Sequence, residues 1–156
     1  MNLMEKICHH IDERKNRWRT EYYRTLFGVK NLDLYHPVFI GNPGNMKLGE
    51  NVAINAFVHI WANAPVEIGD NTMIASHVQI TTSTHDYSVH PMRSKRIDLP
   101  VKIGSNVWIG SGAIIFPGVT IGDDSVIGAG ALVNKDIPSG SIAYGLPAQV
   151  VSKVPR

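Results

Sequence analysis

Branched aliphatic residues occupy every sixth position over a long stretch in the second half of the chain. They are Ile103, Ile109, Ile115, Ile121, Ile127 and Val133, and the positions between them are rich in glycine, small residues and polar residues. A helix repeats its apolar positions about every 3.6 residues and a strand every 2, so a strict period of six fits neither element alone. The pattern predicts short strands and tight turns that repeat as one unit, as in a parallel β-helix of hexapeptide repeats.

Each position of the six-residue unit has its own predicted role, as in Ile103-Gly104-Ser105-Asn106-Val107-Trp108. We expect the first residue to point inward and fill the core. The second is usually glycine, which tolerates the positive φ and the close backbone approach of a corner. The third and fourth are turn residues, and the fifth is small enough for a crowded interior. Three such sides would form one triangular coil, and stacked coils would form a prism.

Two earlier runs follow the same pattern and differ in phase by two residues. They are Leu48, Ile54 and Ile60, and then Ile68, Ile74 and Ile80. The segment Val38–Gly41 is predicted to be an imperfect first coil, since terminal repeats are often atypical. The regular tracts are interrupted once, by a long excursion at about 81–101. A loop longer than about 12–15 residues inside a compact repeat is uncommon and is usually functional or disordered.

Residues 3–27 show a different, helical pattern. Apolar residues recur at steps of three, four and seven, at Met4, Ile7, Ile11, Trp18, Tyr22 and Leu26, with charged residues between them. This predicts one amphipathic helix or two short ones, packed on the first coil or on a neighbouring subunit. We therefore divide the chain into an N-terminal helical segment (1–35), a β-helix domain (36–150) and a C-terminal tail (151–156).

Length and composition narrow the class of protein further. The 156 residues suffice for one domain. A thin prism has a large surface for its volume, so we expect one of its sides to be buried in an oligomer. Three prisms packed side by side would bury such a side in each copy. The lone Cys8 excludes an internal disulfide. A net charge of +2 is too small to indicate nucleic-acid binding. The chain shows neither a secretory signal nor an apolar run of about 18 residues, so we expect a cytoplasmic protein with no membrane span.

Three stretches of the chain resemble the hexapeptide-repeat acyltransferases. They run from Ile68 to Asp86, from Val101 to Ser111 and from Pro117 to Ala148. The likeness is greatest to the maltose and galactoside O-acetyltransferases and the related O-acetyltransferases of polysaccharide gene clusters, and it covers roughly residues 48–150. It implies an all-β fold, a left-handed parallel β-helix, and usually a homotrimer with active sites between subunits. Full-length sugar acetyltransferases begin with a longer helical segment that shapes the acceptor pocket, so the acceptor of this chain stays open.

The resemblance implies direct transfer of an acetyl group from acetyl-CoA to a sugar hydroxyl. Such a transfer needs a base, and histidine is the usual one because its pKa lies near the working pH. His85 matches the family's catalytic histidine, and Asp86 and Tyr87 would orient its imidazole or line the acceptor site. Asn55 and Asn63 match positions near the substrate sugar, and Asn63 replaces an acidic residue of the galactoside enzyme.

Family positions that contact coenzyme A correspond to Ser111, Ala129 and Lys135. Exposed backbone groups beside Ser111 and Ala129 would pair with the pantetheine amides. Trp108 shares their face by its position in the repeat and would pack on pantetheine. Lys135 follows the last regular repeat and would pair with the coenzyme phosphates as a point charge.

Other functions stay open on the sequence alone. An N-acetyltransferase or an antibiotic acetyltransferase of the same family would use the same motifs, and a non-catalytic scaffold could use the same repeat. The γ-carbonic anhydrases share the fold and bind zinc through histidines. In this chain His85 and His90 have the five-residue spacing of the paired zinc ligands in those enzymes, and His59 and His77 are further candidates. The pattern of zinc ligands is incomplete, so we expect no metal.

Overall fold

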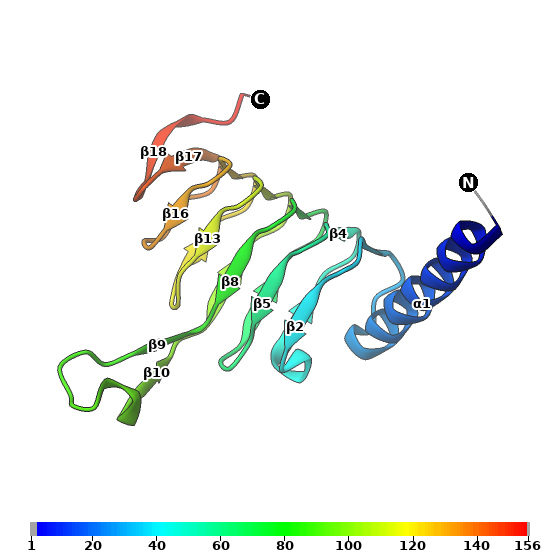
Figure 1. Cartoon of the computed structure of the whole chain (residues 1–156). Helices are drawn as coiled ribbons and strands as arrows, with labels where there is room; N and C mark the ends of the chain where they lie inside the picture. Colours follow the sequence, from blue (N-terminus) through cyan, green and yellow to red (C-terminus); the bar gives the residue numbers. More distant parts are fainter. Residues whose placement is uncertain (1–2, 156) are drawn as a thin grey trace.

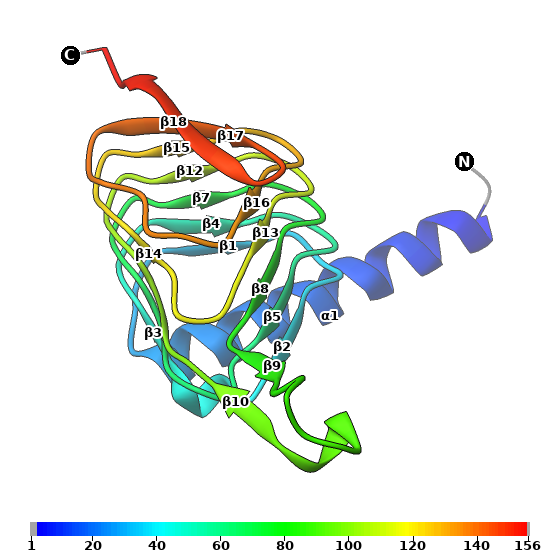
Figure 2. The same cartoon turned by 90° about the vertical axis from the view of Figure 1, so that its left-hand side faces the viewer.

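The hexapeptide units fold into stacked triangular coils, in the computed structural model that describes residues 3–155 (Figure 1). Viewed along the stack, each coil has three sides, and strands of successive coils lie above one another (Figure 2). Parallel pairing joins the coils, for example Ile109 to Ile74 on one side and to Ile127 on the other. The predicted parallel β-helix and the mostly all-β class are confirmed.

Three sheets form the sides of the prism, named here faces A, B and C. Face A contains β1 (Leu32–Leu34), β4 (Val52–Ile54), β7 (Met73–Ile74), β12 (Trp108–Ile109), β15 (Val126–Ile127), β17 (Ser141–Gly145) and β18 (Ala148–Lys153). Face B contains β2 (Phe39–Gly41), β5 (His59–Trp61), β8 (Gln79–Thr81), β13 (Ile114–Ile115) and β16 (Leu132–Val133). Face C contains β3 (Met46–Leu48), β6 (Val66–Ile68), β11 (Val101–Ile103) and β14 (Thr120–Ile121). All three are parallel except that β18 folds back antiparallel on β17.

The excursion leaves the prism after β8 and returns at β11. Its two arms, β9 (Ser83–His85) and β10 (Arg96–Asp98), pair antiparallel, and a short 3₁₀ turn, η2 (Met92–Ser94), lies between them. A second 3₁₀ turn, η1 (Pro43–Asn45), lies outside the excursion, between β2 and β3. Figure 1 shows this hairpin projecting well beyond the prism. The long interruption in the sequence is thus an ordered arm with a defined register.

The core is a column of aliphatic side chains down the centre of the prism. The first-position residues from Ile103 to Val133 are at most 3% exposed. The fifth-position residues are buried as well, as predicted: Val107, Ala113, Val119, Ser125 and Ala131. Every coil contributes the same small set of inward positions, so the column of buried side chains continues through the whole stack.

The prediction for the second-position glycines is right about the close backbone approach and wrong about the positive φ. The positive φ falls on the fourth residue of the unit, as in Asn106 (φ 56) and Gly112 (φ 71), and not on the second. The second-position glycine is required by close stacking. A Cβ on Gly104 would lie 2.6 Å from the backbone nitrogen of Asp123 in the next coil, and 2.3 Å from its carboxylate.

One long helix, α1 (Leu3–Phe27), precedes the first coil. Its C-terminal end packs on the core through Tyr23 and Phe27, and the Arg24 guanidinium donates to the carbonyl of Leu32 at 2.9 Å. Its N-terminal half extends beyond the prism in both views (Figures 1 and 2). The apolar positions that predicted the helix are exposed in the single chain: Met4, Ile7, Ile11, Trp18, Tyr22 and Leu26. The prediction of a helix is confirmed, and most of this apolar surface is left uncovered by the first coil.

The division of the chain into three parts stays a prediction, and residues 1, 2 and 156 lie outside the described range. Among residues 3–155, no helix is long and apolar enough to span a bilayer.

Candidate active site

The predicted site residues gather along two opposite edges of face B. Asn55, Ser111 and Ala129 lie just before its strands and form the N-terminal edge, with Trp108 beside them on β12 of face A. Asn63, His85, Asp86, Tyr87 and Lys135 lie beyond the ends of the strands and form the C-terminal edge. The strands of face B are two or three residues long, which at about 3.3 Å per residue puts roughly 7–10 Å of strand between the two edges. Each edge therefore collects one set, and face B lies between them.

The hairpin that carries His85 is fixed at its base by Thr82. This threonine is buried, and its hydroxyl donates to the carbonyl of Trp61 at 2.9 Å and accepts from the N–H of Ala64 at 3.0 Å. The N–H of Leu99 then donates to the carbonyl of Thr82 at 2.8 Å, which closes the hairpin where it returns to the prism. A hairpin alone is marginally stable, so this attachment fixes where its side chains point.

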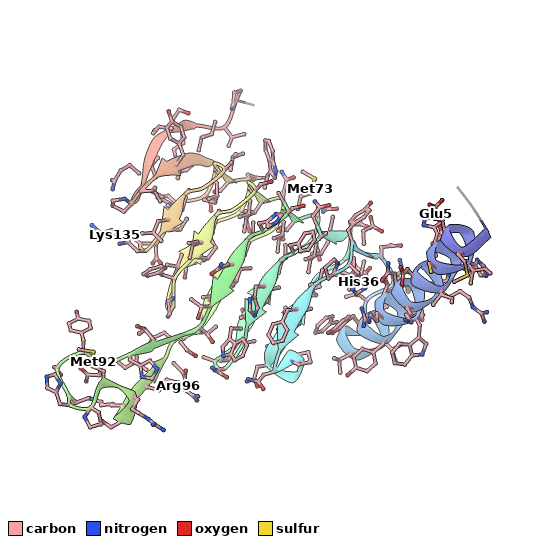
Figure 3. The ribbon with its side chains drawn as sticks, viewed as in Figure 1. Glu5, His36, Met73, Met92, Arg96 and Lys135 are labelled. Carbon is pink, nitrogen blue, oxygen red and sulfur yellow. The ribbon has the colours of Figure 1, made fainter. Side chains whose placement is uncertain are left out.

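His85 is the last residue of β9 and its side chain is exposed. It lies directly across the hairpin from Arg96, and Ser83 lies across from Asp98. Figure 3 shows Arg96 on this projecting hairpin. Because side chains alternate along a strand, Ser83, His85, Arg96 and Asp98 share one face of the hairpin. The arrangement presents an accessible imidazole on an ordered arm.

Asp86 and Tyr87 have different surroundings from those of His85. The Asp86 carboxylate accepts from the ammonium of Lys95 at 2.7 Å and from the N–H of Ser88 at 2.9 Å, and these donors, Lys95 first, lower its pKa below the usual value. None of its recorded hydrogen bonds goes to His85. Tyr87 is highly exposed towards the tip of the hairpin. Asp86 thus stabilises the turn of the hairpin, and a contact of either residue with the acceptor stays a prediction.

Asn63 belongs to a chain of hydrogen bonds that runs across successive coils. The amide of Asn42 donates to Asn63 Oδ1 at 2.7 Å, Asn63 Nδ2 donates to Ser83 Oγ at 2.7 Å, and Ser83 Oγ donates to Asp98 Oδ1 at 2.6 Å. Arg96 completes it, with Nε 2.9 Å and Nη2 2.8 Å from Asp98 Oδ2. The donors follow one direction from Asn42 to Asp98, and Arg96 donates to the same carboxylate from the other side, so these hydrogen bonds hold the hairpin base in one geometry.

The Asp98 carboxylate is the charged centre of this chain. The Ser83 hydroxyl is the main cause that holds its pKa below the ordinary value for aspartate, with further contributions from the Arg96 guanidinium and the nearby His85. An ionised Asp98 keeps Arg96 oriented. Sequence reasoning missed Asn42, Ser83 and Asp98, although Asn42, Asn63 and Ser83 recur at 21 and 20 residues, close to the length of one coil.

The N-terminal edge is lined by small residues in its fourth and fifth coils. Ser111, Gly112, Ala129 and Gly130 follow one another along it, and a Cβ added to either glycine would meet nothing within 4 Å. Among residues 3–155, the N–H groups of Ser111 and Ala129 donate to no other residue. Open space beside free amide donors suits a narrow ligand that carries carbonyl groups.

The equivalent positions on the corner between faces C and A contrast with this edge. There three successive third-position N–H groups are capped by the next coil: Glu50 donates to Asp70 Oδ1 at 2.8 Å, Asp70 to Ser105 Oγ at 3.2 Å and Ser105 to Asp123 Oδ1 at 2.7 Å. In these three coils the corner satisfies its own donors, whereas the edge at Ser111 and Ala129 leaves them for a ligand.

Two further residues complete the predicted set at the N-terminal edge. Trp108 is half exposed on face A immediately before this edge, in a column with Met73 and Val126. Asn55 is half-buried where the second coil turns towards face B, and its N–H donates to the carbonyl of Ile74 at 2.9 Å. The structure thus places Trp108 and Asn55 with Ser111 and Ala129.

Lys135 lies apart from this set, on the C-terminal edge beyond β16 (Figure 3). It is exposed, and its neighbour Asp136 accepts from the N–H of Thr120 at 2.7 Å. In a single chain, Lys135 therefore shares an edge with the His85 hairpin and lies across face B from Ser111 and Ala129.

No group of three or more His, Cys, Asp or Glu side chains is arranged to hold a metal ion in the described part of the chain. A surface hollow of about 620 Å³ lies near the C-terminus, lined by residues such as Asn106, Asp124 and Lys153, and it contains none of the predicted site residues.

Comparison with known proteins agrees with this geometry. Residues 100–135 match the family model "Bacterial transferase hexapeptide (six repeats)". The chain is 42% identical to galactoside O-acetyltransferase of Escherichia coli K12, over 97% of this chain and 85% of that protein. Among solved structures, maltose O-acetyltransferase of Clostridium difficile 630 superposes with a TM-score of 0.83 at 41% identity, covering 88% of this chain and 75% of that one.

A second solved structure bears on the donor. Galactoside acetyltransferase in complex with coenzyme A superposes with a TM-score of 0.75 at 32% identity, covering 91% of this chain and 82% of that chain. The open edge with its free amide donors agrees with such a carrier. The chain therefore belongs to the hexapeptide-repeat acetyltransferases, and it is an acyltransferase that uses acetyl-CoA.

Proposed function

We propose that this enzyme transfers the acetyl group of acetyl-CoA to a hydroxyl group of a saccharide, with His85 as the general base. The observation that carries the proposal is the exposed imidazole of His85 on an arm whose base is hydrogen-bonded to the prism. The galactoside and maltose O-acetyltransferases to which the chain is similar support a sugar as the acceptor.

In this mechanism the imidazole of His85 removes the proton of the acceptor hydroxyl as its oxygen attacks the acetyl carbon. The new C–O bond forms, the C–S bond of the thioester breaks, and the protonated His85 returns the proton to the departing thiolate. Base catalysis of this kind contributes typically 10²- to 10⁴-fold. Direct attack needs no acyl-enzyme, so no cysteine or serine nucleophile is required of the chain.

Residues of the N-terminal edge would hold the donor. The free N–H groups of Ser111 and Ala129 would bond the carbonyl groups of the pantetheine arm, and the half-exposed Trp108 would pack on it. Lys135 would contribute a positive charge near the coenzyme phosphates. Asn55 and Asn63 would lie near the acceptor, with Asn63 acting through Ser83 as well.

The base on the C-terminal edge and the donor on the N-terminal edge of face B meet only if the edges of two neighbouring copies face each other. We propose a homotrimer in which the hairpin of one copy reaches the N-terminal edge of the next, so that each active site lies between subunits. The separation of His85 from Ser111 across face B supports this arrangement. Closed cyclic assembly gives every copy the same pair of contacts. A cytoplasmic location follows as part of the proposal, because acetyl-CoA must be supplied there.

The base is tested with a thiol-release assay, using acetyl-CoA and a panel of sugars and amino sugars. His85→Ala should lose about 10²- to 10⁴-fold in turnover while it keeps its fold and its affinity for coenzyme A. His90→Ala is the matched control from the same loop and should keep its activity. Unchanged turnover in His85→Ala would refute the assignment, and product analysis that finds only amides would refute transfer to a hydroxyl.

Mixed oligomers test the shared site. His85→Ala chains and Ser111→Trp chains should each be inactive alone, since one lacks the base and the other blocks the donor edge. Unfolded together and refolded, they should regain roughly a quarter of the wild-type activity, because random cyclic assembly leaves that fraction of interfaces with two intact edges. Activity that does not return would contradict a site between subunits.

A further inference from the structure

Arg96 is the positively charged residue that shares a hairpin face with His85. The two residues are directly opposed in the antiparallel register. Directly opposed side chains have Cβ atoms about 4.5–5.5 Å apart. A substrate whose hydroxyl reaches the imidazole of His85 therefore passes within reach of the guanidinium of Arg96.

The guanidinium is fixed before any substrate arrives. Its Nε and Nη2 both donate to Asp98 Oδ2, at 2.9 and 2.8 Å, and Asp98 is itself held by Ser83 at 2.6 Å. Through Ser83 the chain continues to Asn63 and Asn42 on earlier coils. Such preorganisation reduces the ordering cost of binding, so the group is built to receive a ligand with little rearrangement.

One edge of the Arg96 fork remains available. A guanidinium has five N–H donors in a plane, and the pair to Asp98 uses the edge formed by Nε and Nη2. Within residues 3–155, Nη1 has no recorded partner, and the side chain is 54% exposed. The free edge offers paired donors, the geometry that carboxylates and phosphates match.

The other cations of the hairpin do not offer the same combination. Lys95 is engaged by Asp86 at 2.7 Å. Arg93 belongs to the 3₁₀ turn η2 near the tip of the hairpin, away from the strand pair that holds His85. Arg96 alone of the three lies opposite the imidazole in the register.

We infer that Arg96 binds an anionic group of the acceptor, so that the preferred substrate is an acidic saccharide bearing a carboxylate or a phosphate close to the acetylated hydroxyl. This rests on the proposed role of His85. The phosphates of the donor are separated from its thioester by the whole pantetheine arm. An anion beside His85 therefore belongs to the acceptor and not to the carrier.

The specificity test compares acceptors that differ in one group: methyl glucoside and galactoside, the corresponding methyl uronosides, and the corresponding 6-phosphates. The wild-type enzyme should use at least one anionic member better than its neutral partner in kcat/KM. Arg96→Met should reduce kcat/KM for that anionic acceptor by roughly 10- to 100-fold more than for its neutral partner, the scale of a hydrogen-bonded charge. A loss common to both acceptors comes from the hairpin base, which Arg96 also supports through Asp98. Comparison of the uronoside with the phosphate tells which anion is recognised.

Arg93→Met is the matched control and should leave the preference intact. Arg96→Lys should restore part of it, because the charge returns without the fork. A wild-type enzyme that uses neutral acceptors at least as well as anionic ones would overturn the inference. So would an Arg96→Met variant that slows both classes equally, since that result indicates a purely structural role.

A binding measurement separates this inference from the proposed mechanism. Calorimetric titration of the uronosides and 6-phosphates into His85→Ala, with coenzyme A present, should show affinity that is lost in His85→Ala/Arg96→Met. That difference needs no turnover, so it persists even if another group is the base. Equal binding to the two variants would overturn the role of Arg96, whereas an active His85→Ala enzyme would overturn only the role of His85.

Discussion

Asn63 Nδ2 donates a hydrogen bond to Ser83 Oγ at 2.7 Å, and this bond ties the second coil to the first residue of the hairpin that carries His85. The two residues are 20 positions apart, about one coil. A residue predicted from family resemblance to lie near the sugar thus has a second task within the chain itself, which is to fix the base of the hairpin.

Replacing Asn63 by alanine should therefore reduce kcat more than it reduces stability. The change removes the donor to Ser83 Oγ and the acceptor of Asn42 Nδ2, so that Asp98 alone still holds the Ser83 hydroxyl. The hairpin base becomes freer, and misplacement of a catalytic group by about 1 Å can cost on the order of 10²-fold. We expect kcat to fall roughly 10- to 100-fold, with the affinity for coenzyme A unchanged. Amide hydrogen exchange of residues 83–98 should become faster.

Asn45→Ala is the matched control for this variant. The amide of Asn45 donates to the carbonyls of Ala62 at 2.9 Å and Asn63 at 3.2 Å but makes no recorded bond to Ser83. Its loss should lower stability by about 1 kcal/mol and leave kcat near the wild-type value. Equal kcat losses in the two variants would show that corner stability, and not the bond to Ser83, is what matters.

Asp98 makes the stability of the hairpin depend on pH. Its pKa in the folded protein lies below the ordinary value, first because the Ser83 hydroxyl donates to it and then because of Arg96. A lowered folded-state pKa stabilises the protein above the unfolded-state pKa of about 3.9, and this contribution is lost as pH falls through the lower folded-state value. Asp98→Asn should therefore cost stability at pH 7 and progressively less below pH about 4. Urea unfolding of both proteins at several pH values tests this, and a difference independent of pH would contradict it.

The core of the fold was predictable because hydrophobic burial follows the period of the chain. Each first-position aliphatic from Ile103 to Val133 is buried where the six-residue spacing places it. The corners were less predictable. The left-handed conformation falls at the fourth position, and in two coils it is occupied by Phe57 and His77, whose rings stack at 4.9 Å. Phenylalanine does not signal a positive φ and histidine signals it only weakly, so the sequence did not mark these two corners.

The candidate site was predictable only in part, for a related reason. His85 could be placed because it interrupts the repeat at a family motif. The roles of Ser83, Arg96 and Asp98 depend on the register of β9 and β10, which no periodicity specifies. The free N–H groups of Ser111 and Ala129 could not be told from capped ones either, because the caps come from the next coil. The family resemblance identified the residues, whereas their division between the two edges of face B follows from the three-dimensional fold.

Gly104 should be far less tolerant of substitution than a glycine outside the stack. A Cβ there meets the backbone and carboxylate of Asp123 at 2.6 and 2.3 Å, so Gly104→Ala must spread two coils and should cost about 1–3 kcal/mol. Gly44→Ala is the control, since nothing lies within 4 Å of its Cβ and its φ is not positive. That change should be neutral or stabilise by up to about 1 kcal/mol. Thermal unfolding that ranks the two variants the other way would refute the stacking role of Gly104.

Trp108 should contribute to donor binding without supporting the fold. Its ring is 51% exposed beside the open edge at Ser111, so truncation removes little buried area and the melting temperature should change slightly. Lost packing on the pantetheine arm should raise the Kd for coenzyme A roughly 10-fold, which corresponds to about 1.4 kcal/mol. Trp18→Ala is the matched control, because Trp18 is an exposed tryptophan on α1 that lies away from this edge, and its Kd should stay at the wild-type value. Calorimetry of coenzyme A binding tests this prediction. If Trp108→Ala binds coenzyme A with wild-type affinity, Trp108 is not part of the donor site, and the N–H groups of Ser111 and Ala129 are left as the main contacts of coenzyme A.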